Sequence, residues 1–234
     1  MSNANPTPIA LIIGASRGLG LAMAAEYLKR GWHVVGTVRG TAKTGLHELA
    51  AQSKGKLEIE SIDIADDKQI AALRKRLDGR SFDLLFVNSG VANGPGDRVG
   101  DTSTEEFTRV MVTNALGPIR VIESFETLVP KSGMIGVMSS GLGSVADNTS
   151  GGWEVYRASK AALNTLMRSF AASHADDPRA MIIMTPGWVR TDMGGSNASL
   201  GIEDSIPRVV DVLMAQAGKP GLRFLNYRGE TNRW

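Results

Sequence analysis

Short apolar runs alternate along the chain with longer segments that are apolar on one side only. Residues 9–13 are typical of a buried strand, and residues 18–30 have the spacing of an amphipathic helix closed by Gly31. The same pattern predicts further strands at residues 34–38, 57–62, 83–87, 134–138, 181–184 and 222–226. It predicts further helices around residues 46–52, 66–77, 103–128, 154–175 and 207–217, with a candidate kink at Pro118.

Strict alternation of strands and helices indicates an α/β protein. Parallel neighbouring strands need right-handed crossovers, and the crossover helices cover both faces of the sheet. We therefore expect one domain spanning residues 1–234, a doubly wound fold with a parallel sheet of about seven strands and helices on both faces. The polar residues 1–7 are expected to form a flexible tail.

Composition narrows the class of protein. The 234 residues include 26 Lys and Arg against 24 Asp and Glu, a balance that does not indicate a nucleic-acid or membrane partner. The absence of Cys excludes disulfides, thiolate catalysis and Cys-based metal sites, and it fits a reducing compartment. The N-terminal segment has neither a basic region nor a long apolar core, so we expect a cytoplasmic protein.

A glycine-rich segment, Gly14-Ala-Ser-Arg-Gly18-Leu-Gly20, joins the first predicted strand to the first helix. In doubly wound folds ligands bind at the carboxyl ends of strands, where this segment lies. Glycines let the backbone approach a pyrophosphate, and the N-terminus of a helix adds N–H donors. The spacing G-x-x-x-G-x-G is not the commoner fingerprint G-x-G-x-x-G, so a tight structural turn is the alternative interpretation.

Two arginines indicate which dinucleotide would bind. Arg17 lies inside the glycine-rich segment, and Arg39 follows the second strand, where an acidic residue would hold a ribose 2′-hydroxyl. That strand ends Gly36-Thr-Val-Arg39 without a carboxylate, and two guanidinium groups suit a 2′-phosphate. We therefore predict NADP(H) in preference to NAD(H), with two solvated surface arginines as the alternative.

Polar residues also follow the third and fourth strands. Asp63 could accept a hydrogen bond from an adenine amino group, or could cap the next helix. Asn88, Ser89 and Gly90 could lie along a ribose, or could form a simple turn. Both groups are expected at the same edge of the sheet as the glycine-rich segment.

Tyr156 and Lys160 carry the candidate chemistry. Four residues apart on a predicted helix, the phenol and the ammonium share one face. An ammonium about 5 Å away favours phenolate by about 3 kcal/mol, which would lower the phenol pKa by about two and make it useful for proton transfer. Ser140, after the fifth strand, could bind a carbonyl oxygen, and Asn114 could anchor a water. The alternatives are a surface Tyr beside a solvated Lys and a Ser that only forms a turn.

Other catalytic classes find little support. His33, His47 and His174 are isolated from one another and from carboxylates, so we expect neither a metal site nor a Ser–His–Asp triad. The G-x-S-x-G elbow of hydrolases is also missing.

Taken in order, these motifs resemble those of the short-chain dehydrogenase/reductase family over nearly the whole chain. The resemblance rests on GASRGLG (14–20), Asp63, VNSG (87–90), Asn114, MSSG (138–141), YRASK (156–160) and PGWVRT (186–191). It implies a Rossmann-type fold, with Asn114 anchoring a water relay, Ser140 orienting the carbonyl, Tyr156 as acid/base, and Lys160 tuning the Tyr156 pKa and binding ribose. It implies cofactor binding by Gly14, Ser16, Arg17, Gly18, Leu19, Gly20, Arg39, Asp63, Ile64, Asn88, Ser89, Gly90, Tyr156, Lys160, Pro186, Gly187, Val189 and Thr191, without a metal.

Some features depart from the family pattern. Ile13 stands where the family often has Thr, and VNSG replaces the usual Asn-Asn-Ala-Gly. The long segment SVADNTSGGWEV before Tyr156 and the ending GLRFLNYRGETNRW resemble the C-factor-like subgroup.

The resemblance implies an NADP(H)-dependent oxidoreductase that acts on a carbonyl or secondary alcohol of a small molecule, as a homodimer or homotetramer. One alternative is a nucleotide-binding regulatory or signalling protein that uses the fold with little or no turnover. Another is a dehydratase or epimerase, which would show no net oxidation of the cofactor.

Overall fold

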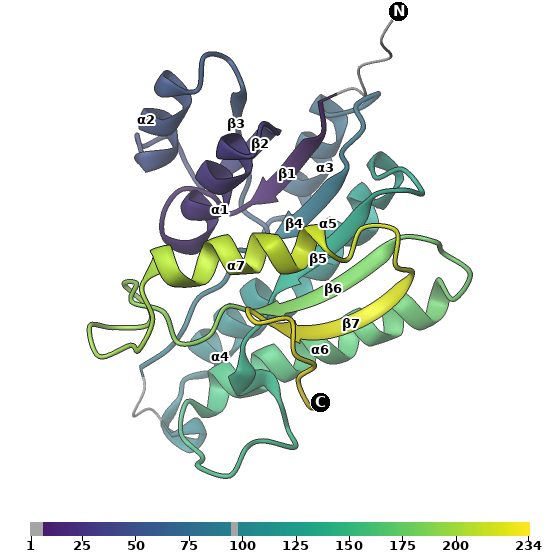
Figure 1. The fold of residues 1–234 in the computed structure, drawn as a ribbon. Helices are drawn as coiled ribbons and strands as arrows, with labels where there is room; N and C mark the ends of the chain where they lie inside the picture. The colour runs from purple at the N-terminus through teal and green to yellow at the C-terminus, as the bar shows by residue number, and fades with distance from the viewer. Residues whose placement is uncertain (1–6, 95–97) are drawn as a thin grey trace, which may run out of the picture.

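The computed structural model describes residues 7–94 and 98–234, and its centre is one seven-stranded parallel sheet (Figure 1). The strands lie in the order β3-β2-β1-β4-β5-β6-β7, and each neighbouring pair is parallel. The predicted strand number and direction are confirmed, and the predicted boundaries agree to within one residue. The strands are β1 (Ile9–Ile13), β2 (His33–Val38), β3 (Leu57–Ser61), β4 (Leu84–Val87), β5 (Met134–Met138), β6 (Ala180–Thr185) and β7 (Gly221–Asn226).

Helices cover both faces of this sheet (Figure 1). Helices α1, α2 and α7 share a hydrophobic cluster with Ile12 of β1, whereas α3, α5 and α6 share a second cluster with Leu11 and Ile13. Successive residues of β1 belong to opposite clusters because side chains alternate across a pleated strand. The helices are α1 (Gly18–Lys29), α2 (Gly45–Gln52), α3 (Asp67–Arg76), α4 (Thr104–Met111), α5 (Gly117–Phe125), α6 (Glu154–Ser173) and α7 (Ile202–Met214).

The predicted flexible tail lies, except for Thr7, outside the described residues. Within residues 7–94 and 98–234, no helix has the length and apolar character that crossing a bilayer requires.

The strand order reverses between β1 and β4, and this reversal positions the candidate site. The chain leaves β1 at Gly14 and β4 at Asn88, and the Asn88 N–H donates to the Ile13 carbonyl at 2.9 Å. A crevice forms outside the carboxyl ends of such strands because their connections run to opposite faces of the sheet.

The long helix predicted at residues 103–128 is divided by a π-helical turn. Ser103 accepts a hydrogen bond from the Glu106 N–H at 3.2 Å and caps α4. The turn Val112–Leu116 follows, in which the Gly117 N–H bonds to the Val112 carbonyl five residues back. Pro118 comes after it, in the first turn of α5, where its missing N–H is tolerated. The π-helical turn therefore precedes Pro118, and Asn114 lies in this turn.

Helix α7 begins at Ile202, five residues before the predicted start at Pro207. A proline favours the first turn of a helix in sequence patterns, but here it lies inside the helix. The Asp204 carboxylate accepts a hydrogen bond from the Gly201 N–H at 3.2 Å, which stabilises the true start. Pro207 removes one intrahelical hydrogen bond, to the carbonyl of the exposed residue Glu203, so the helix tolerates it.

Candidate active site

The glycine-rich segment forms a tight turn that is open toward solvent. The Gly14 N–H donates to Thr37 Oγ1 and Asn88 Nδ2 donates to the Gly14 carbonyl, both at 2.9 Å. A Cβ on Gly20 would overlap the Gly14 carbonyl oxygen, so this position requires glycine. Gly18 differs, because its φ is +56° and a Cβ built there meets nothing within 4 Å.

The first turn of α1 is arranged to receive an anion. It contains no acidic residue, and its N-cap Arg17 makes no capping hydrogen bond through its side chain. The N–H groups at the start of a helix are then left for a ligand, and the helix dipole favours a negative charge. Together with the open space at Gly18, this geometry fits the pyrophosphate of a dinucleotide.

The two predicted phosphate-binding arginines have different surroundings. Arg17 Nη1 lies 2.8 Å from Asp192 Oδ2, and both side chains are largely exposed. Arg39 is exposed and forms no ion pair within the described part of the chain. Arg39 is therefore the free cation beside the end of β2, whereas Arg17 already has a partner.

Asp63 is not the cap of the following helix. The N-cap of α3 is Asp66, whose carboxylate accepts from the N–H groups of Lys68 and Gln69. Asp63 Oδ1 instead accepts from the Ala65 N–H at 2.9 Å, which fixes the turn after β3. The side chain of Ile64 is buried, so Ile64 has only its backbone to offer a ligand.

The backbone after β4 approaches the catalytic candidates. A Cβ on Gly90 would lie 3.3 Å from Lys160 Nζ and 3.5 Å from Asn114 Oδ1. Asn114 is fully buried in the π-helical turn, as its apolar neighbours predict. Its Oδ1 accepts from the Val91 N–H at 2.8 Å, and its Nδ2 donates to the Val91 carbonyl at 2.7 Å and to Ser159 Oγ at 2.9 Å. Asn114 therefore connects the loop after β4 to helix α6.

Tyr156, Lys160 and Ser140 meet as the sequence predicts. Lys160 Nζ lies 5.8 Å from the centre of the Tyr156 ring and donates to the Met138 carbonyl at 3.0 Å. The Tyr156 hydroxyl lies near enough to Ser140 for the two to interact, and Ser140 Oγ accepts a hydrogen bond from the Leu142 N–H at 3.1 Å. The alternative of a solvated surface pair is excluded, because Lys160 is only 3% exposed.

The expected lowering of the Tyr156 pKa is wrong for this state of the protein. Burial raises the pKa of Tyr156 to about 12, and the hydrogen bond with Ser140 lowers it by less. Burial also lowers the pKa of Lys160 to about 8. The ammonium points to the Met138 carbonyl rather than to the phenol oxygen, so the loss of hydration dominates for both groups.

Lys160 should make stability depend on pH. Its pKa falls from 10.5 to about 8 on folding, so between these values the unfolded chain binds a proton that the native protein does not. The free energy of unfolding should therefore rise by about 2 kcal/mol from about pH 8 to about pH 10. Lys160→Met should lose this rise in urea unfolding, whereas Lys56→Met at an exposed site should keep it. An equal rise in Lys160→Met and wild type would contradict the assignment.

The segment between β6 and α7 lies along the same edge of the sheet. Pro186 and Gly187 follow β6, and the Pro186 carbonyl accepts from Ser205 Oγ at 2.6 Å. Val189 forms an isolated bridge with Leu200. Thr191 Oγ1 accepts from the Gly194 N–H at 3.0 Å, which closes a turn. The segment is therefore folded back on itself by its own hydrogen bonds.

Several residues that support the site were missed from the sequence. Thr37 binds the glycine turn, Ser159 binds Asn114, and Asn164 accepts from Ser139 Oγ at 2.7 Å. Ser159 Oγ donates in turn to the Tyr156 carbonyl at 2.7 Å. A signal existed for Ser159, because a buried hydroxyl three residues after Tyr156 on the same helix needs a partner.

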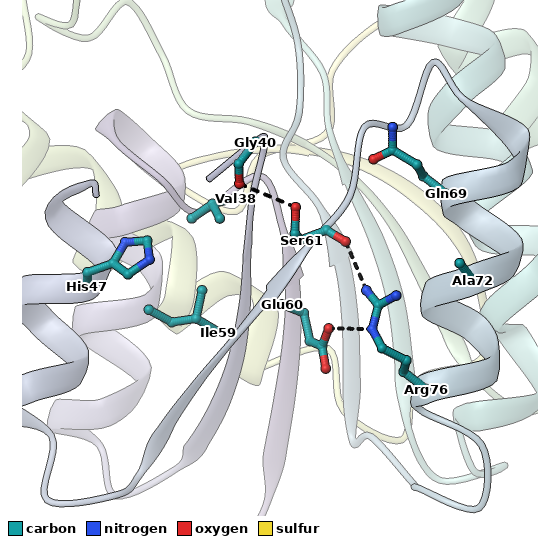
Figure 2. Close-up of a pocket in the computed structure, with 9 residues that line it drawn as sticks. All are labelled: Val38, Gly40, His47, Ile59, Glu60, Ser61, Gln69, Ala72 and Arg76. Atoms are coloured by element: carbon teal, nitrogen blue, oxygen red, sulfur yellow. Dashed lines mark hydrogen bonds and ion pairs between the residues drawn. The ribbon is translucent and has the colours of Figure 1, made fainter. Parts of the chain in front are cut away.

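A cavity of about 520 Å³ lies on the edge strand β3 between α2 and α3 (Figure 2), and Val38 and Gly40, the two neighbours of Arg39, line it. Figure 2 shows His47 and Ile59 on one side of it and Gln69 and Arg76 on the other. Arg76 donates to Glu60 Oε2 at 2.8 Å and to the Ser61 carbonyl at 3.0 Å, which covers part of the free edge of the sheet. The cavity contains none of the predicted site residues.

Metal-binding side chains do not cluster in residues 7–94 and 98–234: no three His, Asp or Glu come together in a group that could hold an ion.

The chain is similar in sequence and in structure to several known proteins. The family model described as short chain dehydrogenase matches residues 8–199. A protein from Burkholderia multivorans, described as a short-chain dehydrogenase/reductase with bound NADP, is 57% identical, with a TM-score of 0.96, over 98% of this chain and 100% of that one. A carbonyl reductase from Pseudomonas aeruginosa PAO1 in complex with NADP is 31% identical, with a TM-score of 0.89, over 97% of this chain and 100% of that one. The C-signal protein of Myxococcus xanthus is 34% identical over 154 residues, which are 65% of this chain and 92% of that protein.

Proposed function

The chain belongs to the short-chain dehydrogenase/reductase family, and on that premise we propose that it is an NADP(H)-dependent oxidoreductase acting on a small-molecule carbonyl or secondary alcohol. The observation that carries the proposal is the group formed by the half-buried Tyr156 and Ser140 and the buried Lys160, beside an open glycine turn. A regulatory nucleotide-binding protein would have no use for a phenol held against a second hydroxyl.

The cofactor would lie along the carboxyl ends of β1, β4 and β6. The glycine turn and the N-terminus of α1 would hold its pyrophosphate, and Arg39 its 2′-phosphate. Lys160, next to Gly90, would bind its ribose, and the segment from Pro186 to Thr191 would line the nicotinamide. A nicotinamide cofactor held by these residues would supply the hydride chemistry of the reaction.

Tyr156 and Ser140 would act on the substrate oxygen. Both hydroxyls would donate hydrogen bonds to the carbonyl oxygen, which polarises the carbonyl and fixes its orientation. With a pKa of about 12, the Tyr156 phenol holds its proton at neutral pH, so it is ready to serve as the acid in carbonyl reduction. Lys160 would neutralise the phenolate left behind after the proton moves.

Asn114 would position the site rather than react. Both N–H groups of its amide are already donated, and one hydrogen bond reaches its oxygen. A proton-carrying water could bind only at the remaining lone pair of Oδ1. The proposed assembly is a homodimer or homotetramer through the helices at residues 104–125 and 154–173, on which Phe107, Leu116 and Leu166 are exposed.

A direct assay tests the proposed function. Purified protein is mixed with NADPH and a panel of aldehydes and ketones, and NADPH oxidation is followed by absorbance alongside a titration of NADPH binding. Oxidation with at least one carbonyl compound supports the oxidoreductase. Tight NADPH binding without oxidation would instead favour a signalling role, which the similarity to the C-signal protein makes worth testing.

Arg39→Ala should reduce the preference for NADPH. Loss of a charge-assisted hydrogen bond to the 2′-phosphate should raise the Kd for NADPH about tenfold and leave that for NADH within about twofold. Calorimetric titration of both nucleotides measures the change. Arg80→Ala is the control, because Arg80 pairs with Glu58 and precedes β4 at the opposite end of the sheet. An unchanged ratio of the two Kd values would remove Arg39 from the 2′-phosphate site.

A further inference from the structure

Helix α6 begins from an unusual left-handed turn. Trp153, its N-cap, has φ 53° and ψ 36°, and it follows Gly151 and Gly152 with φ of 63° and 68°. Glycine adopts this conformation readily, but a residue with a large side chain does so only when its surroundings impose it. A strained backbone beside a catalytic tyrosine indicates that the position of the indole matters.

Arg157 imposes this turn. Its side chain is buried, and its guanidinium donates to the Gly152 carbonyl at 2.9 Å, to Ser150 Oγ at 3.0 Å and to the Gly151 carbonyl at 3.1 Å. Its backbone N–H donates to the Trp153 carbonyl at 2.7 Å. These three partners of the buried cation all lie in the loop before Tyr156, and a planar guanidinium can hold several acceptors at fixed angles.

The other end of the same loop is also fixed. The Ala146 N–H donates to the Trp234 carbonyl at 2.9 Å, and Arg233 Nη1 lies 3.0 Å from Asp147 Oδ1. Ser144 Oγ accepts from the Asp147 N–H at 3.1 Å. The loop is therefore preformed at both ends before any substrate arrives.

The turn places the Trp153 indole against the catalytic phenol. The rings of Trp153 and Tyr156 meet edge to face with their centres 6.0 Å apart, while Lys160 Nζ approaches the same phenol ring at 5.8 Å. Residues 153, 156 and 160 follow one stripe of a helix, so the indole and the ammonium lie at opposite ends of the row. Lys160 adjoins Gly90 on the proposed cofactor side, and the indole lies at the other end of the row, away from Gly90.

We propose that Trp153 is a substrate-binding residue that selects carbonyl compounds with an aryl group next to the carbonyl, and that Arg157 is the positioning residue that presents it. The inference rests on the proposed function of the Tyr156 site. A half-buried indole offers a flat apolar face to an aromatic ring, whereas a methyl group would gain little from it.

The experiment compares 1-phenyl-1,2-propanedione with 2,3-butanedione, which differ by phenyl in place of methyl. Trp153→Gly removes the indole but keeps a residue suited to the left-handed conformation. The ratio of kcat/KM for the phenyl compound over the methyl compound should fall about tenfold in this variant, mainly through KM. Arg157→Met should lower the ratio similarly, and the double variant should lower it no further. Arg80→Met, far from the loop, should keep the wild-type ratio.

A binding measurement separates this inference from the proposed function. The Kd of 1-phenyl-1,2-propanedione is measured by saturation-transfer NMR on the NADP⁺-loaded protein, and it should rise about tenfold in Trp153→Gly. If the wild type oxidises NADPH with no compound of the aldehyde and ketone panel, the proposed function fails, but a higher Kd in Trp153→Gly still supports the indole contact. Equal Kd values, an unchanged kcat/KM ratio in Trp153→Gly, or no binding to the wild type would overturn the role of Trp153. A normal ratio in a folded Arg157→Met variant would overturn that of Arg157.

Discussion

Tyr156→Phe should lower kcat about 1,000-fold, because it removes the proton that the substrate oxygen needs as the hydride is transferred. The Tyr156 side chain is half-buried beside Ser140, and none of the hydrogen bonds of the described residues brings another acidic group to Ser140. The phenyl ring keeps its contacts with Trp153 and Lys160. Nucleotide binding should therefore stay within about twofold of wild type. Steady-state NADPH oxidation and a calorimetric titration measure the two effects.

Tyr27→Phe is a matched control. The Tyr27 hydroxyl is buried, on helix α1, and it has no hydrogen-bond partner among the residues that the structure describes. Removing it deletes an unsatisfied polar atom, so the control should keep its turnover and lose no stability. Full turnover in Tyr156→Phe would refute the acid role of this residue. A loss of the same size in both variants would show that the assay reports folding rather than chemistry.

The strands could be predicted because central strands of a parallel sheet are apolar on both faces. Residues such as Leu84 to Val87 and Met134 to Met138 are buried throughout, so each strand appears as an uninterrupted apolar run. The π-helical turn at Asn114 and the start of α7 could not be predicted. They depend on which hydrogen bonds the folded chain makes, such as that of Asp204 with the Gly201 N–H, and proline patterns do not reveal these.

Which residues meet at the site could also be predicted, because the ends of parallel strands meet at one edge of the sheet. Ser140 and Tyr156 lie near each other at that edge, and Gly90 lies beside Lys160. The pKa values of Tyr156 and Lys160 could not be predicted. The spacing of the two residues does not determine how much hydration each side chain loses on folding. The left-handed turn at Trp153 was hidden for a similar reason, since it depends on the reach of a buried Arg157.

Asn114→Leu should lower the free energy of unfolding by about 3 kcal/mol, although leucine is close to asparagine in size. The amide satisfies the N–H and carbonyl of Val91 and the hydroxyl of Ser159, and leucine would leave all three without this partner. Val91 is half-buried, so water can restore part of the loss there, but the bond with Ser159 is fully enclosed. Urea unfolding followed by circular dichroism measures the change.

Ser159→Ala gives an intermediate test of the same network, because it removes one of the three bonds and should cost about 1 kcal/mol. Asn197→Leu, at an exposed site, should change stability by no more than about 0.5 kcal/mol. In Asn114→Leu the turnover should fall further than that of Ser159→Ala, since the loop that carries Gly90 toward Lys160 is anchored by the Val91 bonds. Wild-type stability and turnover in Asn114→Leu would contradict the role of the Asn114 amide in joining the loop after β4 to helix α6.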